Sequence, residues 1–230
     1  MSAYRHELKY HISYGQMQIL TRRLASVMQP DAFARADGTY LIRSLYFDNL
    51  QDRALKEKVY GTSRREKFRI RYYNLDPTFI RLEKKSKINR LTSKESTPLT
   101  AAQCEQILRG DIPSLAGEAS PNLLNEFYAK TQLYSLIPKA VVDYTRRTFV
   151  YPVSDTRITL DYHIRTGMRV VDFLNPALPT VPCDAAEDAP ICILEVKYNE
   201  FLPLHIAALL QTDDIRIAPF SKYEVSRRYD

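Results

Sequence analysis

Cations occupy alternate positions in much of the segment 64–94, RREKFRIRYYNLDPTFIRLEKKSKINRLTSK. Alternate residues of a strand share a face, so the segment predicts two antiparallel strands, joined by a turn over 74–78, that present one charged face. The residues on this face are Lys67, Arg69 and Arg71 in the first strand and Arg81, Glu83, Lys85 and Lys87 in the second. Two like charges about 4 Å apart repel by about 4 kcal/mol at an effective dielectric of about 20, so this crowding needs water or an anion to offset it. The pattern predicts a polyanion-binding surface.

Carboxylates are interspersed among these cations. Glu83 lies within the charged face, Glu7 precedes Lys9 in RHELKY, and Glu195 precedes Lys197 in LEVKY. Each carboxylate repels phosphate, so a nucleic-acid groove gains nothing from it. Mg²⁺ or Mn²⁺ resolves this conflict, because either ion binds carboxylates and phosphate oxygens together. Each Glu has the alternative of a salt bridge with a neighbouring Lys or Arg. Glu195 is the best metal candidate.

Eight segments of the chain read as strands, counting the two above. The other six are 4–11, 41–48, 139–150, 156–162, 168–173 and 191–198. Helices are predicted at 15–29, 49–60, 101–109, 122–136, 204–211 and 222–229. A polar strand face is usually the solvated side of a sheet, but eight strands tend to close into a barrel. We therefore expect an α+β fold, an eight-stranded antiparallel β-barrel (tunnel) with helices packed outside, in a single domain over 1–230.

Composition excludes several other classes of protein. The net charge of +6 over 230 residues suits an anionic ligand, although it is also ordinary for a soluble protein. Three cysteines without CxxC spacing argue against a disulfide framework or a zinc site. The N-terminus carries charges where a signal peptide needs an apolar run, and no window approaches the roughly 18 consecutive apolar residues of a membrane helix. No GxGxxG or P-loop motif is present. We expect a cytoplasmic protein that binds phosphate groups through side chains.

Several segments together resemble the catalytic domain of the vacuolar transporter chaperone (VTC) polyphosphate polymerases. In chain order they are RHELKY, SLYFDN, FRIRYYN, RLEKKSK, RITLD, LEVKY and FSKYEVSRRY. That domain belongs to the CYTH group, or triphosphate tunnel metalloenzymes, so the resemblance implies a β-tunnel that binds ATP and inorganic polyphosphate. By similarity, the phosphates would be bound by Lys9, Arg69, Arg71, Lys85, Arg146, Arg157 and Lys222, with Lys87 and Lys94 as further candidates. Glu195 would hold Mn²⁺ or Mg²⁺. We add other charged residues of the same strand faces as substrate contacts: Glu7, Lys67, Arg81, Glu83 and Lys197.

The resemblance implies transfer of the ATP γ-phosphate to a growing polyphosphate chain by electrostatic catalysis, without a side-chain nucleophile. The hydrolytic branch of the superfamily begins with the motif ExExK, whereas this chain has Arg5 at the first Glu position. This replacement favours the polymerase. Two alternatives remain: a triphosphatase that hydrolyses tripolyphosphate or an organic triphosphate, and a non-catalytic polyanion or nucleic-acid binding module. We expect ATP and polyphosphate as partners, no nucleic acid and no membrane span, in a stand-alone catalytic domain without the SPX domain or membrane segments of eukaryotic VTC subunits.

Overall fold

The computed structural model describes residues 6–89, 91–183, 191–212, 216–217 and 220–227. Within these residues one antiparallel sheet has eleven strands, of which eight contain seven residues or more. The long strands are β1 (His6–Ile12), β3 (Thr39–Asp48), β4 (Arg64–Tyr73), β5 (Asp76–Ile88), β6 (Leu91–Leu99), β7 (Ile137–Tyr151), β8 (Thr156–Gly167) and β10 (Cys192–Tyr198). The short ones are β2 (Gln29–Pro30), β9 (Val181–Pro182) and β11 (Arg216–Ile217). The expected mainly antiparallel sheet with eight principal strands is confirmed.

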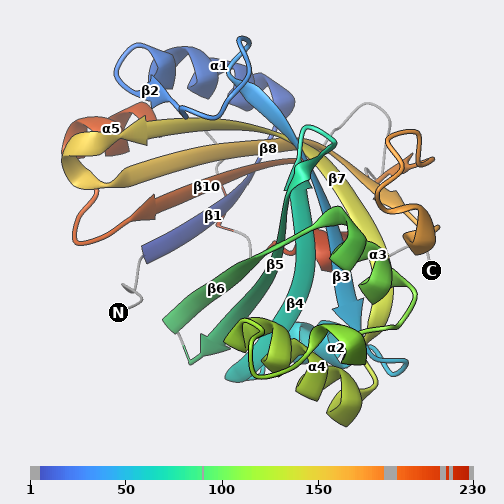
Figure 1. Ribbon diagram of the computed structural model, residues 1–230. Helices are drawn as coiled ribbons and strands as arrows, with labels where there is room; N and C mark the ends of the chain where they lie inside the picture. Colours follow the sequence, from blue (N-terminus) through green and yellow to red (C-terminus); the bar gives the residue numbers. More distant parts are fainter. Residues whose placement is uncertain (1–5, 90, 184–190, 213–215, 218–219, 228–230) are drawn as a thin grey trace.

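The sheet curls so that its two ends face each other (Figure 1). Its strand order is β11-β1-β10-β8-β7-β3-β4-β5-β6, with β2 paired to β7 and β9 to β8. Strands β1, β10 and β8 form one wing and β4, β5 and β6 the other, and the long strands β7 and β3 join them. Among the described residues no backbone pairing connects β6 with β1 or β11, so backbone hydrogen bonds do not close the tunnel.

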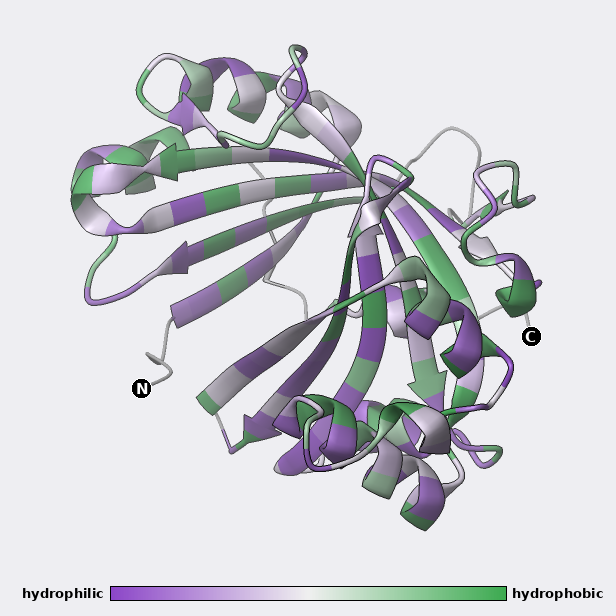
Figure 2. Ribbon diagram, in the orientation of Figure 1, coloured by the Kyte–Doolittle hydropathy of each residue, from purple (hydrophilic) through white to green (hydrophobic). Residues whose placement is uncertain are grey.

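Alternation of residue type gives each strand two different faces, as the bands of contrasting hydropathy show (Figure 2). In β4, Phe68, Ile70 and Tyr72 are buried on the convex side, while the intervening cations lie on the concave side. The β4–β5 turn needs only Asn74 and Leu75, whose φ angles of 53° and 57° are left-handed. Such two-residue turns match the twist of a hairpin, so they keep the two charged faces in register.

Helices cover the convex side of both wings (Figure 1). Helices α1 (Tyr14–Ala25) and α5 (Leu204–Leu209) pack on the first wing, where Leu20 and Leu24 meet Leu194 of β10. Helices α3 (Ala101–Leu108) and α4 (Asn122–Tyr134) pack on the second. Capping boxes at Ser13 and Thr100 begin α1 and α3. Helix α2 (Arg53–Val59) lies between β3 and β4 in the chain, and 3₁₀ turns occupy Pro113–Leu115, Pro152–Ser154 and Val170–Asp172.

Helix α6 (Lys222–Ser226) corrects the expectation that all helices lie outside the sheet. Its residues Tyr223 and Val225 pack against Ile42 of β3 and Val142 of β7, which face the concave side. The helix therefore forms part of the inner wall. It brings Lys222 inside the curled sheet, where the charged strand faces meet.

Two sequence-based strand predictions need correction. The segment 168–173 is not a strand: β8 ends at Gly167, and Val170–Asp172 form a 3₁₀ turn that the Arg169–Asp172 ion pair of 2.9 Å supports. The eighth long strand is instead β6, which was not predicted. In the described part of the chain, no helix combines the length and apolar character needed to cross a membrane.

Candidate active site

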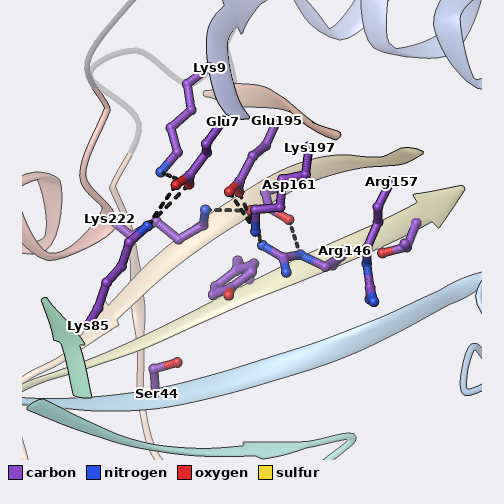
Figure 3. Close-up of polar contacts among 12 residues, drawn as sticks. Glu7, Lys9, Ser44, Lys85, Arg146, Arg157, Asp161, Glu195, Lys197 and Lys222 are labelled. Carbon is purple, nitrogen blue, oxygen red and sulfur yellow. Dashed lines mark hydrogen bonds and ion pairs between the residues drawn. The ribbon is translucent and has the colours of Figure 1, made fainter. Parts of the chain in front are cut away.

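Strand register brings the charged residues of the first wing together. Lys9 of β1 lies opposite Glu195 of β10, and Asp161 of β8 lies opposite Arg146 of β7. Because alternate residues share a face, these side chains all reach the concave side. They form the first charge cluster, which we define as Glu7, Lys9, Arg146, Asp161, Glu195, Lys197 and Lys222 (Figure 3).

Asp161 and Glu195 form ion pairs with the cations of this cluster. Both Asp161 carboxylate oxygens accept from Arg146, at 2.6 and 2.7 Å, and Oδ2 also accepts from Lys222 Nζ at 2.5 Å. Glu195 pairs with Lys197 at 2.8 Å and lies 3.9 Å from Arg146. Burial would raise the pKa of Asp161, but Arg146 and Lys222 outweigh it and lower the pKa to about 2. Both carboxylates are therefore held ionised among cations.

Glu7 links the first cluster to the opposite wing. Its carboxylate lies 3.1 Å from Lys9 Nζ and 3.0 Å from Lys85 Nζ on β5. Because Glu7 pairs with Lys197 and Lys9 pairs with Glu195 in the β1–β10 register, Glu7 and Glu195 are diagonal neighbours on the concave face. Burial disfavours the charge on Lys9, yet Glu195 and Glu7 raise its pKa above the ordinary value. Two adjacent carboxylates are a partial metal site, and no group of three or more His, Cys, Asp or Glu side chains suited to a metal occurs among the described residues.

The second charge cluster lies on β4, β5 and β6 and consists of Arg69, Arg71, Glu83 and Lys94. Glu83 is only 2% exposed, and it lies 2.6 Å from Arg69, 3.8 Å from Arg71 and 2.5 Å from Lys94. Burial opposes ionisation, but these cations hold the pKa of Glu83 far below its usual range. The single Glu83 carboxylate is therefore paired with three cations.

Lys67 and Tyr46 lie beside the second cluster. The Lys67 Nζ is 5.6 Å from the centre of the Tyr46 ring, whose hydroxyl accepts from Arg69 at 3.3 Å. No ion pair of Lys67 occurs among the described residues. Burial, with Lys85 and other cations, lowers the pKa of Lys67 to about 7. Burial alone would raise the pKa of Tyr46, but Arg69, Lys67 and Arg71 lower it to about 7.

Tyr144 of β7 connects the two clusters. Its hydroxyl accepts a hydrogen bond of 3.0 Å from Arg71, whose Nε also donates to Ser44 at 3.3 Å. The Lys222 ammonium lies 4.5 Å from the centre of the Tyr144 ring. Tyr144 therefore joins the two clusters, and Glu7 joins the first cluster to Lys85 of the opposite wing.

Three other predicted residues share the concave face but lie outside both clusters. Arg157 pairs with Asp31 at 2.7 Å and donates to the Tyr40 hydroxyl at 3.2 Å. Arg81 donates to Ser96 at 3.2 Å and stacks on Phe79. Lys87, near the end of β5, makes no ion pair within the described residues. The structure therefore brings most predicted site residues together, whereas Arg5 lies outside the described residues.

Sequence reasoning missed some residues of the site. Asp161 shares a strand face with Arg157, and Tyr144 lies two residues before Arg146, so alternation could have identified both. Tyr46 and Ser44 also follow this rule within β3. Of the two neighbours Arg146 and Arg147, Arg146 lies on the concave face beside Asp161, while the Arg147 guanidinium lies beside Gly38.

The arrangement can hold an extended anion. The carboxylates of the two charge clusters, Glu7, Glu83, Asp161 and Glu195, are all paired with cations, as the salt-bridge alternative predicted. The cations nevertheless outnumber them, and the surplus is spread over both clusters. Phosphate oxygens would satisfy these cations without requiring a new arrangement of the strands.

The chain is similar to one family of protein domains and, at low identity, to several solved structures. A solved structure from Bacillus halodurans, of a protein proposed to be an adenylate cyclase, is 13% identical, with a TM-score of 0.49 over 85% of this chain and 81% of the other. The PH1012 protein from Pyrococcus horikoshii OT3 is 11% identical, with a TM-score of 0.44 over 92% of this chain and 94% of the other. No curated protein matches the sequence. The model of the VTC domain matches residues 4–229, nearly the whole chain, and the chain therefore belongs to the VTC domain family.

Proposed function

We propose that this protein is an enzyme of the triphosphate-tunnel type that transfers the γ-phosphate of ATP to a growing inorganic polyphosphate chain. Membership of the VTC domain family supports the enzyme class. The observation that carries the finer proposal is the extended series of cations on the concave face, whose two clusters are joined by Tyr144 and which reaches Lys85 through Glu7. One triphosphate occupies only part of such a series, so an acceptor chain can be bound beside it.

Catalysis would be electrostatic. Arg69, Arg71 and Arg146 are fixed by carboxylates and hydroxyls before substrate arrives, so they need little rearrangement to stabilise charge on the equatorial oxygens of the transferred phosphoryl group. Lys85, Lys9 and Lys222 would bind the flanking phosphates and hold donor and acceptor in line. Within the proposed reaction, Arg157, Arg81 and Lys87 would guide the chain near the ends of the tunnel.

Glu7 and Glu195 fit a divalent cation. Their side chains are diagonal neighbours on β1 and β10 (Figure 3), and oxygen ligands from bound phosphates would complete the coordination of Mn²⁺ or Mg²⁺. When bound, the ion would neutralise charge on the phosphates. The adjacent Lys197 and Arg146 hold Glu195 ionised, as a metal ligand must be. We assign metal binding to Glu195, with Glu7 as its partner.

The interpretation as a single VTC-like domain over 1–230 also remains a proposal. It rests on the shared strands β7 and β3, which contribute to both wings. ATP and polyphosphate are the proposed partners. Nucleic acid is disfavoured because a phosphodiester backbone gains nothing from the carboxylates of the two clusters, whereas Glu7 and Glu195 can serve a metal-bound polyphosphate through the ion.

The test is incubation with ATP and Mn²⁺, primed with pyrophosphate. We expect ADP together with a polymer that an exopolyphosphatase digests. Arg146→Glu should abolish chain growth, whereas Arg147→Glu, one residue away on the opposite face, should retain it. Free phosphate as the only product from ATP or tripolyphosphate would establish the triphosphatase instead. Tighter binding of single-stranded RNA than of tripolyphosphate at physiological salt would favour the nucleic-acid module.

A further inference from the structure

Helix α6 supplies Lys222 to the first cluster, yet it has only five residues. A helix this short does not persist on its own propensity, because nucleation costs more than its few hydrogen bonds return. Lys222 nevertheless has a defined position, 2.5 Å from Asp161 and 4.5 Å from the centre of the Tyr144 ring. Contacts outside the helix must fix it there.

Tyr223 anchors α6 to strand β3. Its side chain is 3% exposed, and its ring stacks on Tyr46 with centroids 5.2 Å apart and an interplanar angle of 27°. Its hydroxyl donates to Asp48 Oδ2 at 2.9 Å. The stack holds the ring over β3, and the hydrogen bond fixes its direction.

Asp48 is itself held rigidly at the end of β3. It is fully buried, and its carboxylate accepts backbone N–H groups of Asn49 and Ala54 at 2.9 Å and of Leu55 at 3.1 Å. These bonds tie the carboxylate to the start of α2. Four donors in total satisfy the Asp48 carboxylate, so its position is set by the β3–α2 junction and not by α6.

The other polar contacts of α6 and its C-cap are weaker. Lys58 pairs with Glu224, and Arg227 lies 3.3 Å from Asp52. In the first pair both side chains remain about a quarter exposed, and such pairs contribute little to stability. The buried Tyr223 hydroxyl, in contrast, has no water available to replace a lost partner.

We propose that Asp48, acting through the Tyr223 hydroxyl, is the positioning residue that places Lys222 at the phosphate site. The proposal rests on the proposed function, because it assigns Lys222 a phosphate as its ligand. Asp48 and Tyr223 touch no phosphate in this arrangement. They fix the short helix, and Lys222, the neighbour of Tyr223, then reaches Asp161.

The first test is a double-mutant cycle on tripolyphosphate binding, measured by calorimetry. Tyr223→Phe should weaken binding about ten-fold, the effect of losing a hydrogen bond to a charged group. Lys222→Met should weaken it by at least as much, and adding Tyr223→Phe to Lys222→Met should cause no further loss. Additive losses would overturn the proposal, since Tyr223 would then act independently of Lys222. Tyr72→Phe is the matched control: it removes a buried 2.9 Å hydrogen bond on the opposite face, to Phe173, and should leave affinity unchanged.

A second readout needs no ligand. Acetylation of Lys222 by acetic anhydride, followed by mass spectrometry, should become several-fold faster in Tyr223→Phe and in Asp48→Asn, but not in Tyr72→Phe. An unchanged rate in folded Tyr223→Phe would refute the positioning role. If the wild-type protein binds no tripolyphosphate while the acetylation result holds, the proposed function fails and the placement of Lys222 stands.

Discussion

Lys85 of β5 donates to the Glu7 carboxylate of β1 at 3.0 Å, across the side of the sheet where the described strands share no backbone hydrogen bond. The tunnel is therefore completed by side chains. Lys85 is a proposed phosphate ligand and Glu7 a proposed metal partner, so the residues that close the ring are also those that substrate would engage. Substrate binding would replace the Lys85–Glu7 ion pair by contacts of both residues with the ligand.

Glu83 should stabilise the empty site more than the occupied one. Because it is buried between Arg69 and Arg71, Glu83→Gln leaves their charges uncompensated and should lower the free energy of unfolding by about 3–5 kcal/mol. Tripolyphosphate supplies the missing negative charge. The melting temperature should therefore rise more on adding tripolyphosphate in Glu83→Gln than in wild type, and sulfate at equal ionic strength should not reproduce this.

The outer ion pair Arg43–Asp143 provides the control for this experiment. It is equally buried, with a distance of 2.8 Å, but lies on the convex side under the segment that carries Phe173. Asp143→Asn should destabilise the protein to a similar extent, and tripolyphosphate should raise its melting temperature only as much as in wild type. Equal responses in Glu83→Gln and Asp143→Asn would show that the ligand does not bind beside Glu83.

Removing the charge of Glu195 should eliminate metal-dependent activity. Glu195→Gln keeps the shape of the side chain but loses the negative charge that attracts Mn²⁺, so half-saturation by Mn²⁺ should require at least ten-fold more metal. Glu7→Gln should have a similar, smaller effect. Glu66→Gln, which breaks an ion pair with Lys130 on the convex side, is the control. If Glu195→Gln kept the wild-type dependence on Mn²⁺, the assignment of Glu195 as a metal ligand would be wrong.

Much of the site could be predicted from the sequence, because successive side chains of a strand point to opposite faces of the sheet. Alternation placed Arg69, Glu83 and Lys85 on one face without knowledge of the fold. This alternation does not predict, however, which strands of the two wings come close together in the folded sheet. The Lys85–Glu7 contact joins residues far apart in the chain, and it depends on the curl of the whole sheet.

The two strand errors have a common physical origin. Strand β6, LTSKESTPL, has few apolar residues on either face, and only Thr97 and Leu99 are buried, so its own pattern is weak. It forms because the edge of β5 offers a full row of backbone partners. The segment 168–173 has the β-branched residues of a strand but pairs with none of the described strands, and it turns so that Phe173 packs on Tyr72. Helix α6 likewise reads as an outer helix until its docking site on Asp48 is known.

The last prediction concerns pH and starts from Lys67. Burial lowers its pKa to about 7, and the cations that face it, Arg69 on its own strand, Lys85 and Lys9, act in the same direction while Tyr46 opposes them. The Lys67–Tyr46 pair therefore loses a proton near neutral pH in the folded protein, whereas an unfolded lysine keeps its proton to about pH 10.4. Between these values the folded state holds fewer protons, so the free energy of unfolding of the ligand-free protein should increase as the pH rises from about 7 to about 10.

Ligand binding should show the opposite dependence. A phosphate chain beside Lys67 favours the charged ammonium, so binding above pH 7 must take up a proton, and affinity should fall by up to about ten-fold per pH unit for each proton taken up. Calorimetry in two buffers of different ionisation enthalpy measures this uptake. At pH 8, Lys67→Met should take up about one proton fewer than wild type, while Lys84→Met, on the convex face and paired with Glu126, should match wild type. The same uptake in Lys67→Met and wild type would place the phosphate away from Lys67, and the second cluster would then bind the chain without it.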